Sequence, residues 1–335
     1  MSAAEVTKDT KLSDLTDAQR AELGQRAKEE SFSGQALLGP QETLDGLEEE
    51  YRKGNYAEFA DKVKWLREKG DFIGMRRVRG DGNCFYAAFA FAVVQKLLHF
   101  NDRPMHHFMV KHLEGTLALL KKTGFDESIY LEFWEPFKKL LNRMHSTDPE
   151  VVELNDQRLQ QAFNDAYIVN SIVAYLRLVT SAYLKDNAED FTPFLFTLED
   201  EFGGKAPTLD DFCANQVEAI GKEADHVQIA ALSSCLKVSL HVAYLTASGA
   251  PPETPALEKK MGEAFAGGVA VPGEAAAIKR EAANDPHRVD LVEFEVPSTI
   301  GVGMDIGTLL FRPGHYDLLV RAAPQASPDI SIPRA

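Results

Sequence analysis

The chain has 335 residues, of which 36 are Lys or Arg and 51 are Asp or Glu, so its formal net charge is -15. This acidity argues against a nucleic-acid-binding protein, which needs a basic face to neutralise phosphates, and it favours partners with a basic surface. The three cysteines, Cys84, Cys213 and Cys235, are too few for a disulfide framework and form no C-x-x-C zinc pair.

The start of the chain and its apolar segments indicate an intracellular protein. The opening MSAAEVTKDTKLSD lacks the basic and apolar regions of a signal peptide. The longest apolar run, Cys84 to Val94, is shorter than the ~20 residues that span a bilayer. We therefore expect a cytoplasmic monomer, with nuclear residence left open, that has no membrane segment, cofactor or metal.

Helical patterns dominate the first two thirds of the chain. Charged residues and alanine fill residues 1–43, which we predict to be a mobile arm with a conditional helix over residues 16–30. From Asn55 onward, apolar residues recur at helical spacing. The expected helices cover residues 56–66, 84–98, 103–123, 129–144, 167–184, 209–220 and 226–236.

Strand patterns appear at residues 72–79 and then only late, at 238–244 and 292–296. A hairpin is predicted where two apolar triplets, residues 309–311 and 318–320, flank Arg312-Pro313-Gly314. Helices first and strands last predict an α+β fold, with a small, mostly antiparallel sheet beside a helical lobe. The Pro-, Gly- and Ala-rich residues 247–288 predict an exposed insertion between two strands.

The segment Asp81-Gly82-Asn83-Cys84 lies where a predicted strand turns into a predicted helix. Cys84 then falls in the first helical turn, where free backbone N–H groups and the helix dipole stabilise a thiolate. The same N–H groups could hold the oxyanion that forms when a carbonyl is attacked. The alternative is a buried structural cysteine at the start of a core helix, which is common for free cysteines.

A thiol nucleophile needs a base, and His315 is the best placed of the nine histidines. It follows the Pro313-Gly314 turn and begins a predicted strand. Residues two apart on a strand point the same way, so Asp317 can orient the ring of His315. This pattern predicts a Cys-His pair with an orienting carboxylate.

His226 is the rival base. It follows Asp225, which has the character of an N-cap, so His226 also fits a packed first-turn residue of a helix. Cys213 and Cys235 lie within apolar helical patterns and are expected in the core.

The segment Asp81-Gly82-Asn83-Cys84-Phe85-Tyr86 resembles the nucleophile motif of the ovarian-tumour (OTU) cysteine proteases. Phe311-Arg312-Pro313-Gly314-His315-Tyr316-Asp317 resembles the histidine motif of their otubain branch. The segments Ala174 to Ser181 and Phe212 to His226 also resemble otubains, in the same order. The likeness runs from about Leu44 to Val320, interrupted at 247–288.

The resemblance implies a papain-like catalytic domain over residues 44–322, followed by a C-terminal tail at residues 323–335. It implies a cysteine deubiquitinase in which Cys84 is the nucleophile, His315 the general base and Asp317 the orienting acid. Asp81 matches the acidic residue of the nucleophile motif. The oxyanion hole is expected from the backbone N–H groups of Asp81, Gly82 and Cys84.

The implied partners are ubiquitin and polyubiquitin chains. Linkage through ubiquitin's forty-eighth residue, a lysine, is a family expectation. Some otubains instead restrain ubiquitin-conjugating enzymes without catalysis, which is the alternative function here. A general papain-like peptidase is a third interpretation, weakened by the absence of a signal or pro-segment. Two departures from the family are Ala87, where otubains commonly have Arg, and the insertion at 247–288.

Overall fold

A computed structural model describes residue 32 and residues 34–195, 206–246, 285, 287–294 and 304–322. The helix expected over residues 16–30, the tail at 323–335 and most of the insertion at 247–288 lie outside these described residues. The elements in chain order are β1 (Leu38–Glu42), α2 (Leu44–Lys53), α3 (Ala57–Glu68), β2 (Phe72–Val78), α4 (Cys84–Phe100), α5 (Arg103–Lys122), α6 (Glu127–Asn142), α7 (Asp156–Ala162), α8 (Ala166–Asp186), α9 (Ala188–Leu195), α10 (Leu209–Phe212), the π-helix η3 (Cys213–Val217), α11 (His226–Leu236), β3 (Val238–Tyr244), β4 (Asp290–Phe294), β5 (Met304–Arg312) and β6 (His315–Arg321).

Polar side chains fix where the helices start. Asp102 caps α5 by accepting from the Met105 N–H, and Asp165 caps α8 in the same way. Asp225 and Gln228 form a reciprocal capping box at the start of α11. These caps satisfy N–H groups that have no partner inside the helix, so each helix begins at a defined residue.

The strands form one sheet in the order β1-β2-β6-β5-β3-β4. Only the β3–β5 pair is parallel, and the other four pairs among the described strands are antiparallel. β6 therefore lies between β2 and β5, although it is the last of the described strands along the chain. This position brings the start of β6 beside the end of β2, where the turn to α4 begins.

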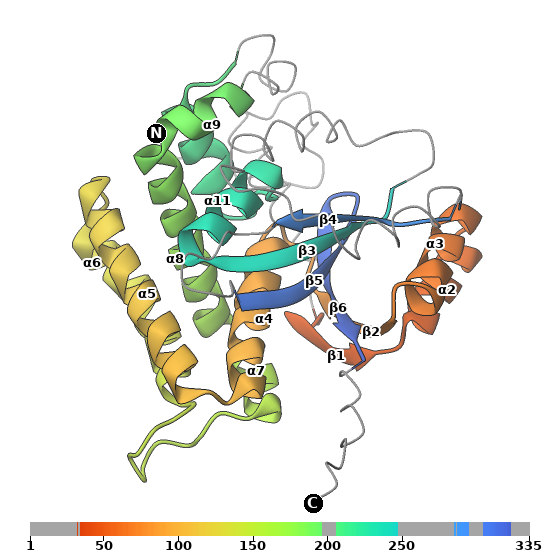
Figure 1. Cartoon of the computed structure of the whole chain (residues 1–335), viewed down its shortest axis with the longest axis horizontal. Helices are drawn as coiled ribbons and strands as arrows, with labels where there is room; N and C mark the ends of the chain where they lie inside the picture. The colour runs from red at the N-terminus through yellow and green to blue at the C-terminus, as the bar shows by residue number, and fades with distance from the viewer. Residues whose placement is uncertain are drawn as a thin grey trace, which may run out of the picture.

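Helices cover both faces of this sheet (Figure 1). Side chains alternate across a strand, so Leu309 and Leu318 pack on the side of α4 and α8, whereas Leu310 and Leu319 pack against α2 and α3. The larger helical lobe, α5 to α9, lies beyond α4 (Figure 1). The result is the expected α+β fold.

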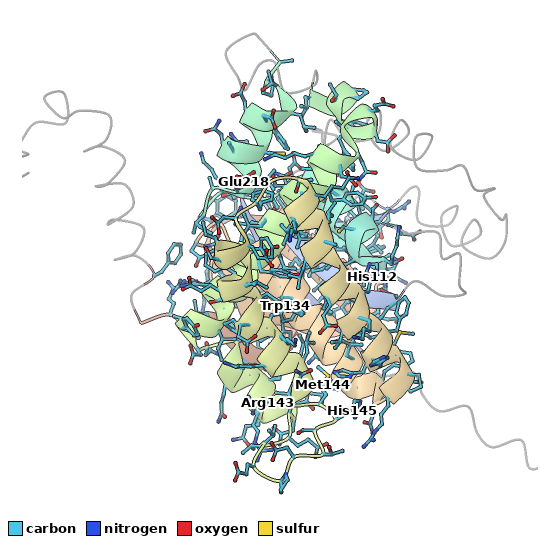
Figure 2. The ribbon with its side chains drawn as sticks, turned by 90° about the vertical axis from the view of Figure 1, so that its left-hand side faces the viewer. His112, Trp134, Arg143, Met144, His145 and Glu218 are labelled. Carbon is cyan, nitrogen blue, oxygen red and sulfur yellow. The ribbon has the colours of Figure 1, made fainter. Side chains whose placement is uncertain are left out.

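Helix α8 forms the centre of the helical lobe. By length and composition it could cross a membrane, but 72% of its most apolar window is buried inside the fold, as in the core helix of a soluble protein. On its outer side, the ring of Tyr175 packs against Trp134 of α6 in a tilted arrangement, with 5.1 Å between ring centroids. His112 of α5 joins the lobe to α11 through a 2.7 Å hydrogen bond to the Cys235 carbonyl. Figure 2 views this lobe from its outer side and labels Trp134 and His112.

The sheet begins earlier in the chain than expected. Residues 38–42 form β1, which pairs with β2, and Leu38 is 2% exposed. The folded part of the chain therefore starts before the boundary expected at residue 43. The sequence pattern did not predict β1, because Gly39 and Pro40 are poor strand formers. Proline is tolerated here because β1 is an edge strand of the sheet.

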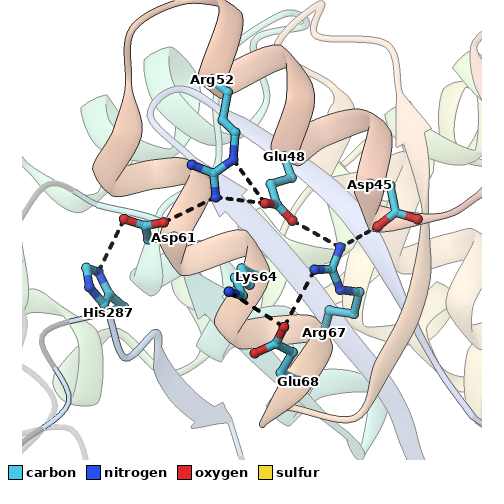
Figure 3. A network of polar contacts seen from close by, with 8 residues as sticks. All are labelled: Asp45, Glu48, Arg52, Asp61, Lys64, Arg67, Glu68 and His287. Atoms are coloured by element: carbon cyan, nitrogen blue, oxygen red, sulfur yellow. Dashed lines mark hydrogen bonds and ion pairs between the residues drawn. The ribbon is translucent and has the colours of Figure 1, made fainter.

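A charged network joins α2 to α3 (Figure 3). Arg52 of α2 contacts Asp61 of α3 at 3.3 Å, and Asp61 also contacts His287 at 3.9 Å. Lys62 of α3, nearly buried, donates to the Thr246 carbonyl. Thr246 and His287 flank most of the insertion, so its two ends are held at the same helix.

Candidate active site

A sharp turn between β2 and α4 places Cys84 at the first residue of the helix. We call residues 79–83 the nucleophile loop and residues 218–225 the facing loop. Gly82 has φ +84°, and a Cβ there would lie 2.0 Å from the Gly221 carbonyl oxygen of the facing loop. Only glycine fits this contact. Cys84 is 1% exposed, and its Sγ accepts the Tyr316 backbone N–H at 3.4 Å.

Asp81 shapes the nucleophile loop. Its Oδ1 accepts the Asn83 N–H at 2.9 Å, and its Oδ2 accepts the Arg79 Nη2 at 2.8 Å. The Asp81 N–H donates to the Arg79 carbonyl at 2.9 Å, so this member of the expected oxyanion hole is occupied here. The N–H groups of Gly82 and Cys84 donate to no residue in the part of the chain that the structure describes. Those two remain the better placed donors for an oxyanion.

The β5–β6 hairpin carries the histidine. His315 is the first residue of β6, and its Nε2 lies 2.8 Å from Oδ1 of Asp317 two residues on. Its other ring nitrogen, Nδ1, is buried near Gly80 of the nucleophile loop. The structure thus brings Cys84, His315 and Asp317 into one site, as the sequence predicts.

Asp317 is fully buried and held by three donors. They are the His315 ring, the Val78 N–H at 2.9 Å and the Arg312 Nη2 at 2.6 Å. Burial by itself raises the pKa of Asp317, but the hydrogen bond from His315 and the charge of Arg312 outweigh it. The carboxyl pKa therefore lies below its ordinary value, and Asp317 is an anion at neutral pH.

The charge of Asp317 acts on His315. Burial lowers the pKa of His315, yet the hydrogen bond to Asp317 and the negative charges of Asp317 and Cys84 raise it to about 9. An imidazolium is therefore favoured at neutral pH next to the sulfur. A cationic histidine stabilises a thiolate, which is the reactive form of cysteine.

Arg312 is a member of the site that the sequence reasoning missed. It pairs with His315 across the hairpin and forms an ion pair with Asp317 at 2.6 Å. Burial lowers the pKa of Arg312, but the negative charge of Asp317 and the interaction with the Tyr51 side chain raise it above its ordinary value. A buried carboxylate needs a buried hydrogen-bond donor, so the expected burial of Asp317 could have pointed to a cationic partner such as Arg312.

An open groove of about 550 Å³ lies beside His315. Its arginines are paired, Arg77 with Glu42 and Arg79 with Asp81, which argues against a phosphate site. The lining residues of the groove are Gln35, Ala36, Gly39, Arg77, Val78, Arg79, Gly80, Arg312 and His315.

The rival base, His226, has another role. Its Nδ1 contacts Asp225 at 2.5 Å and its Nε2 contacts the Tyr244 hydroxyl at 2.8 Å, so both ring nitrogens are used. Cys213 and Cys235 are buried, and burial raises the pKa of Cys213 to about 11 and that of Cys235 to about 12. Neither thiol is suited to attack at neutral pH. Within the described residues, no cluster of three or more His, Cys, Asp or Glu could hold a metal.

Comparison with known proteins agrees with this geometry. The model of the peptidase C65 otubain family matches residues 30–321. The chain belongs to the otubain family. Otubains are a family of cysteine peptidases, which is consistent with a thiol at the start of α4.

Two relatives illustrate the otubain likeness. The OVARIAN TUMOR DOMAIN-containing deubiquitinating enzyme 1 of Arabidopsis thaliana is 29% identical over 292 residues, 87% of this chain and 83% of its own length. Ubiquitin thioesterase OTUB2 of Homo sapiens is 34% identical over 186 residues, 55% of this chain and 71% of its own length. The otubain match begins at residue 30, before the boundary expected at 43, which agrees with the place of β1 in the sheet.

Solved otubain structures share the fold. One is titled "The structure of h/ceOTUB1-ubiquitin aldehyde-UBC13~Ub". Its TM-score to this chain is 0.69 at 23% identity, and the match covers 92% of this chain and 100% of that one. The papain-like α+β architecture expected from the motifs is therefore confirmed.

Proposed function

We propose that this otubain is a cysteine deubiquitinase, which hydrolyses the bond between the C-terminal carbonyl of ubiquitin and an amine of a chain or conjugate. The observation that carries the proposal is the buried Asp317 bonded to His315, with Cys84 at the start of α4. The names of the relatives, a deubiquitinating enzyme and a ubiquitin thioesterase, supply the substrate class.

The reaction divides into two steps. The Cys84 thiolate attacks the carbonyl, the Gly82 and Cys84 N–H groups stabilise the oxyanion, and the C–N bond breaks as His315 gives its proton to the leaving amine. A thioester between Cys84 and ubiquitin remains. His315 then takes a proton from water, which attacks the thioester. The C–S bond breaks, Cys84 leaves as a thiolate beside the imidazolium, and the carboxyl group of the released ubiquitin loses its proton to solvent.

A ubiquitin probe with a C-terminal electrophile tests this function. We expect one covalent adduct on the wild-type chain, at Cys84, and none on Cys84→Ala, as read by intact mass. Cys213→Ala and Cys235→Ala are matched controls that should still form the adduct, because burial raises the pKa of both thiols. An adduct that persists in Cys84→Ala would refute the assignment.

A panel of di-ubiquitins would then measure linkage preference. We expect faster cleavage of chains joined through ubiquitin's forty-eighth residue, a lysine. Equal cleavage of all linkages would contradict this family expectation while leaving the chemistry intact.

A second candidate function is restraint of ubiquitin-conjugating enzymes without catalysis. Two solved otubain structures favour it, since their titles name ubiquitin aldehyde with UBC13~Ub or UBCH5B~Ub. If it holds, the Cys84→Ala variant should still slow chain synthesis by a ubiquitin-conjugating enzyme. Synthesis at the uninhibited rate would rule it out for this chain.

A further inference from the structure

A buried arginine of α8 contacts the nucleophile loop. Arg177 is 0% exposed, and its Nη2 donates to the Gly82 carbonyl and to Asn83 Oδ1, each at 2.9 Å. The same guanidinium donates to the Lys222 carbonyl at 2.6 Å and to the Val217 carbonyl at 2.9 Å. One side chain therefore joins the loop before α4 to the segment that follows α10.

The nucleophile loop and the facing loop are in direct contact. The Gly82 backbone contacts the Gly221 carbonyl, and Asn83 Oδ1 accepts the Gly221 N–H at 3.0 Å as well as Arg177. Carbonyl groups turned inward here need a buried donor, since an unsatisfied buried acceptor costs about 1–3 kcal/mol. Arg177 supplies that donor to both loops, so the position of the nucleophile depends on it.

Arg177 also brings a charge to the site. Its hydrogen-bond acceptors among the described residues are neutral carbonyl or amide oxygens. Its guanidinium carbon lies 4.4 Å from the ring centroid of Tyr86 in the first turn of α4. Burial lowers the pKa of Arg177, and interactions with Tyr86, Cys84 and Asp81 oppose this effect. A buried cation with no carboxylate among its hydrogen-bond acceptors favours an anion nearby, and the sulfur is the one that the reaction needs.

We propose that Arg177 is a positioning residue, which clamps the nucleophile loop to the facing loop and supplies positive charge that favours the Cys84 thiolate. This inference rests on the proposed role of Cys84 as nucleophile. The competing explanation is an arginine that stabilises the fold without any effect on the reactivity of Cys84.

Two substitutions separate these explanations. Arg177→Met removes the charge and the donors at similar length, whereas Arg177→Lys keeps the charge and loses the planar fork. Arg76→Met is the matched control. Arg76 also lies over an aromatic ring, 5.4 Å from the Phe91 centroid, and burial also lowers its pKa, but it donates to Gln160 of α7.

The main readout is alkylation of Cys84 by iodoacetamide across pH, followed by mass spectrometry, with thermal unfolding as a check on folding. Hydrolysis of a fluorogenic ubiquitin C-terminal substrate gives kcat and KM in parallel. Alkylation needs no ubiquitin. If the wild-type chain does not react with the ubiquitin probe, the proposed function is wrong. The comparison of alkylation rates between the variants remains valid in that case.

We expect Arg177→Met to slow alkylation at pH 7 by ~10-fold or more and to move its pH profile upward, because only the thiolate reacts. Arg177→Lys should recover most of the alkylation rate but little of kcat. The lysine restores the positive charge but not the set of hydrogen bonds by which the guanidinium joins the two loops. Arg76→Met should keep the wild-type pH profile, even if it unfolds at a lower temperature.

A folded Arg177→Met variant with the wild-type alkylation profile would overturn the proposal, as would an equal shift in Arg76→Met. If Arg177→Met does not fold, Asn83→Ala is the deciding variant. It keeps Arg177 but removes the oxygen that the guanidinium and the Gly221 N–H share. Its kcat should fall with KM little changed, and an unaltered kcat would likewise overturn the proposal.

Discussion

The buried carboxylate of Asp317 makes His315 unlike a surface histidine. Its partner raises the pKa of His315 to about 9, from an ordinary value of 6.5. Because the pKa is raised in the folded state, the imidazolium stabilises the fold fully below about pH 6.5, and this contribution is lost as pH rises through about 9. The site therefore keeps its charged histidine across the neutral range.

Removing the charge of Asp317 should act on the chemical step. We expect Asp317→Asn to lower kcat by ~10–1000-fold with ubiquitin affinity nearly unchanged, because the ring loses its preferred tautomer and its counter-charge. An NMR titration of His315 should show its pKa falling from about 9 in the variant. Unchanged kcat would mean that another group orients the imidazole.

The two candidate histidines can be ranked in the same assay. His315→Ala should lose nearly all turnover, whereas His226→Ala should retain more, because His226 is bonded to Asp225 and Tyr244. The reverse order would move the base to His226.

Sequence reasoning predicted the site residues Cys84, His315 and Asp317 but missed the two arginines that contact them or their loop. Cys84 lies two residues after Gly82 and His315 directly after Gly314, both at turns that local sequence patterns indicate. Arg177 and Arg312 act through partners 94 and 5 positions away, on Asn83 and Asp317. The local hints for Arg177 were its place in the otubain-like segment Ala174 to Ser181 and a charge in the apolar middle of a helix, which implies a buried partner.

At the level of elements, the join between the nucleophile loop and the facing loop depends on Gly82. We expect Gly82→Ala to cost more than about 1–2 kcal/mol, the penalty for a left-handed residue alone, because its Cβ would also overlap Gly221. Activity should fall with stability. Gly115→Ala, in the exposed middle of α5 with open space around it, should instead stabilise by about 0.5–1 kcal/mol. Denaturant unfolding measures both, and a harmless Gly82→Ala would contradict the packing described.

The strand β1 predicts where the chain can be shortened. A chain lacking residues 1–31 should unfold near the wild-type temperature. One lacking residues 1–43 loses the buried Leu37 and Leu38, and each apolar side chain contributes about 1.5–3 kcal/mol. It should therefore unfold several degrees lower. Equal unfolding temperatures for the two shortened chains would show that residues 32–43, including β1, do not stabilise the fold.

Helices were easier to foresee than the first strand. The expected start of α11 at His226 and the span of β3 are confirmed, because a cap and strict alternation mark them locally. The short helices α7 and α9 were missed, as were α2 and β1. Each of these is short or poor in apolar residues, so only packing against the rest of the fold defines it.

At the scale of the whole molecule, the insertion at 247–288 can be shortened to ask whether it contributes to stability. Tyr244 pairs with Asp290 in adjacent antiparallel strands, so the two ends of the intervening segment lie side by side. Replacing residues 250–284 with a short Gly/Ser linker should keep the melting temperature within a few degrees, since doubling a loop costs only about 0.6 kcal/mol. A collapse in stability would show that the segment packs as an element of its own.

The place of β6 in the sheet has a consequence for the order of folding during synthesis. β6 lies between β2 and β5, and it carries His315, 231 residues after Cys84. Until the ribosome has released β6, β2 has no neighbour on that side and the thiol has no base. Such long-range pairing is slow to form. The nascent chain therefore lacks the base for Cys84 through most of its synthesis, and β6, the last of the described strands, completes both the sheet and the active site.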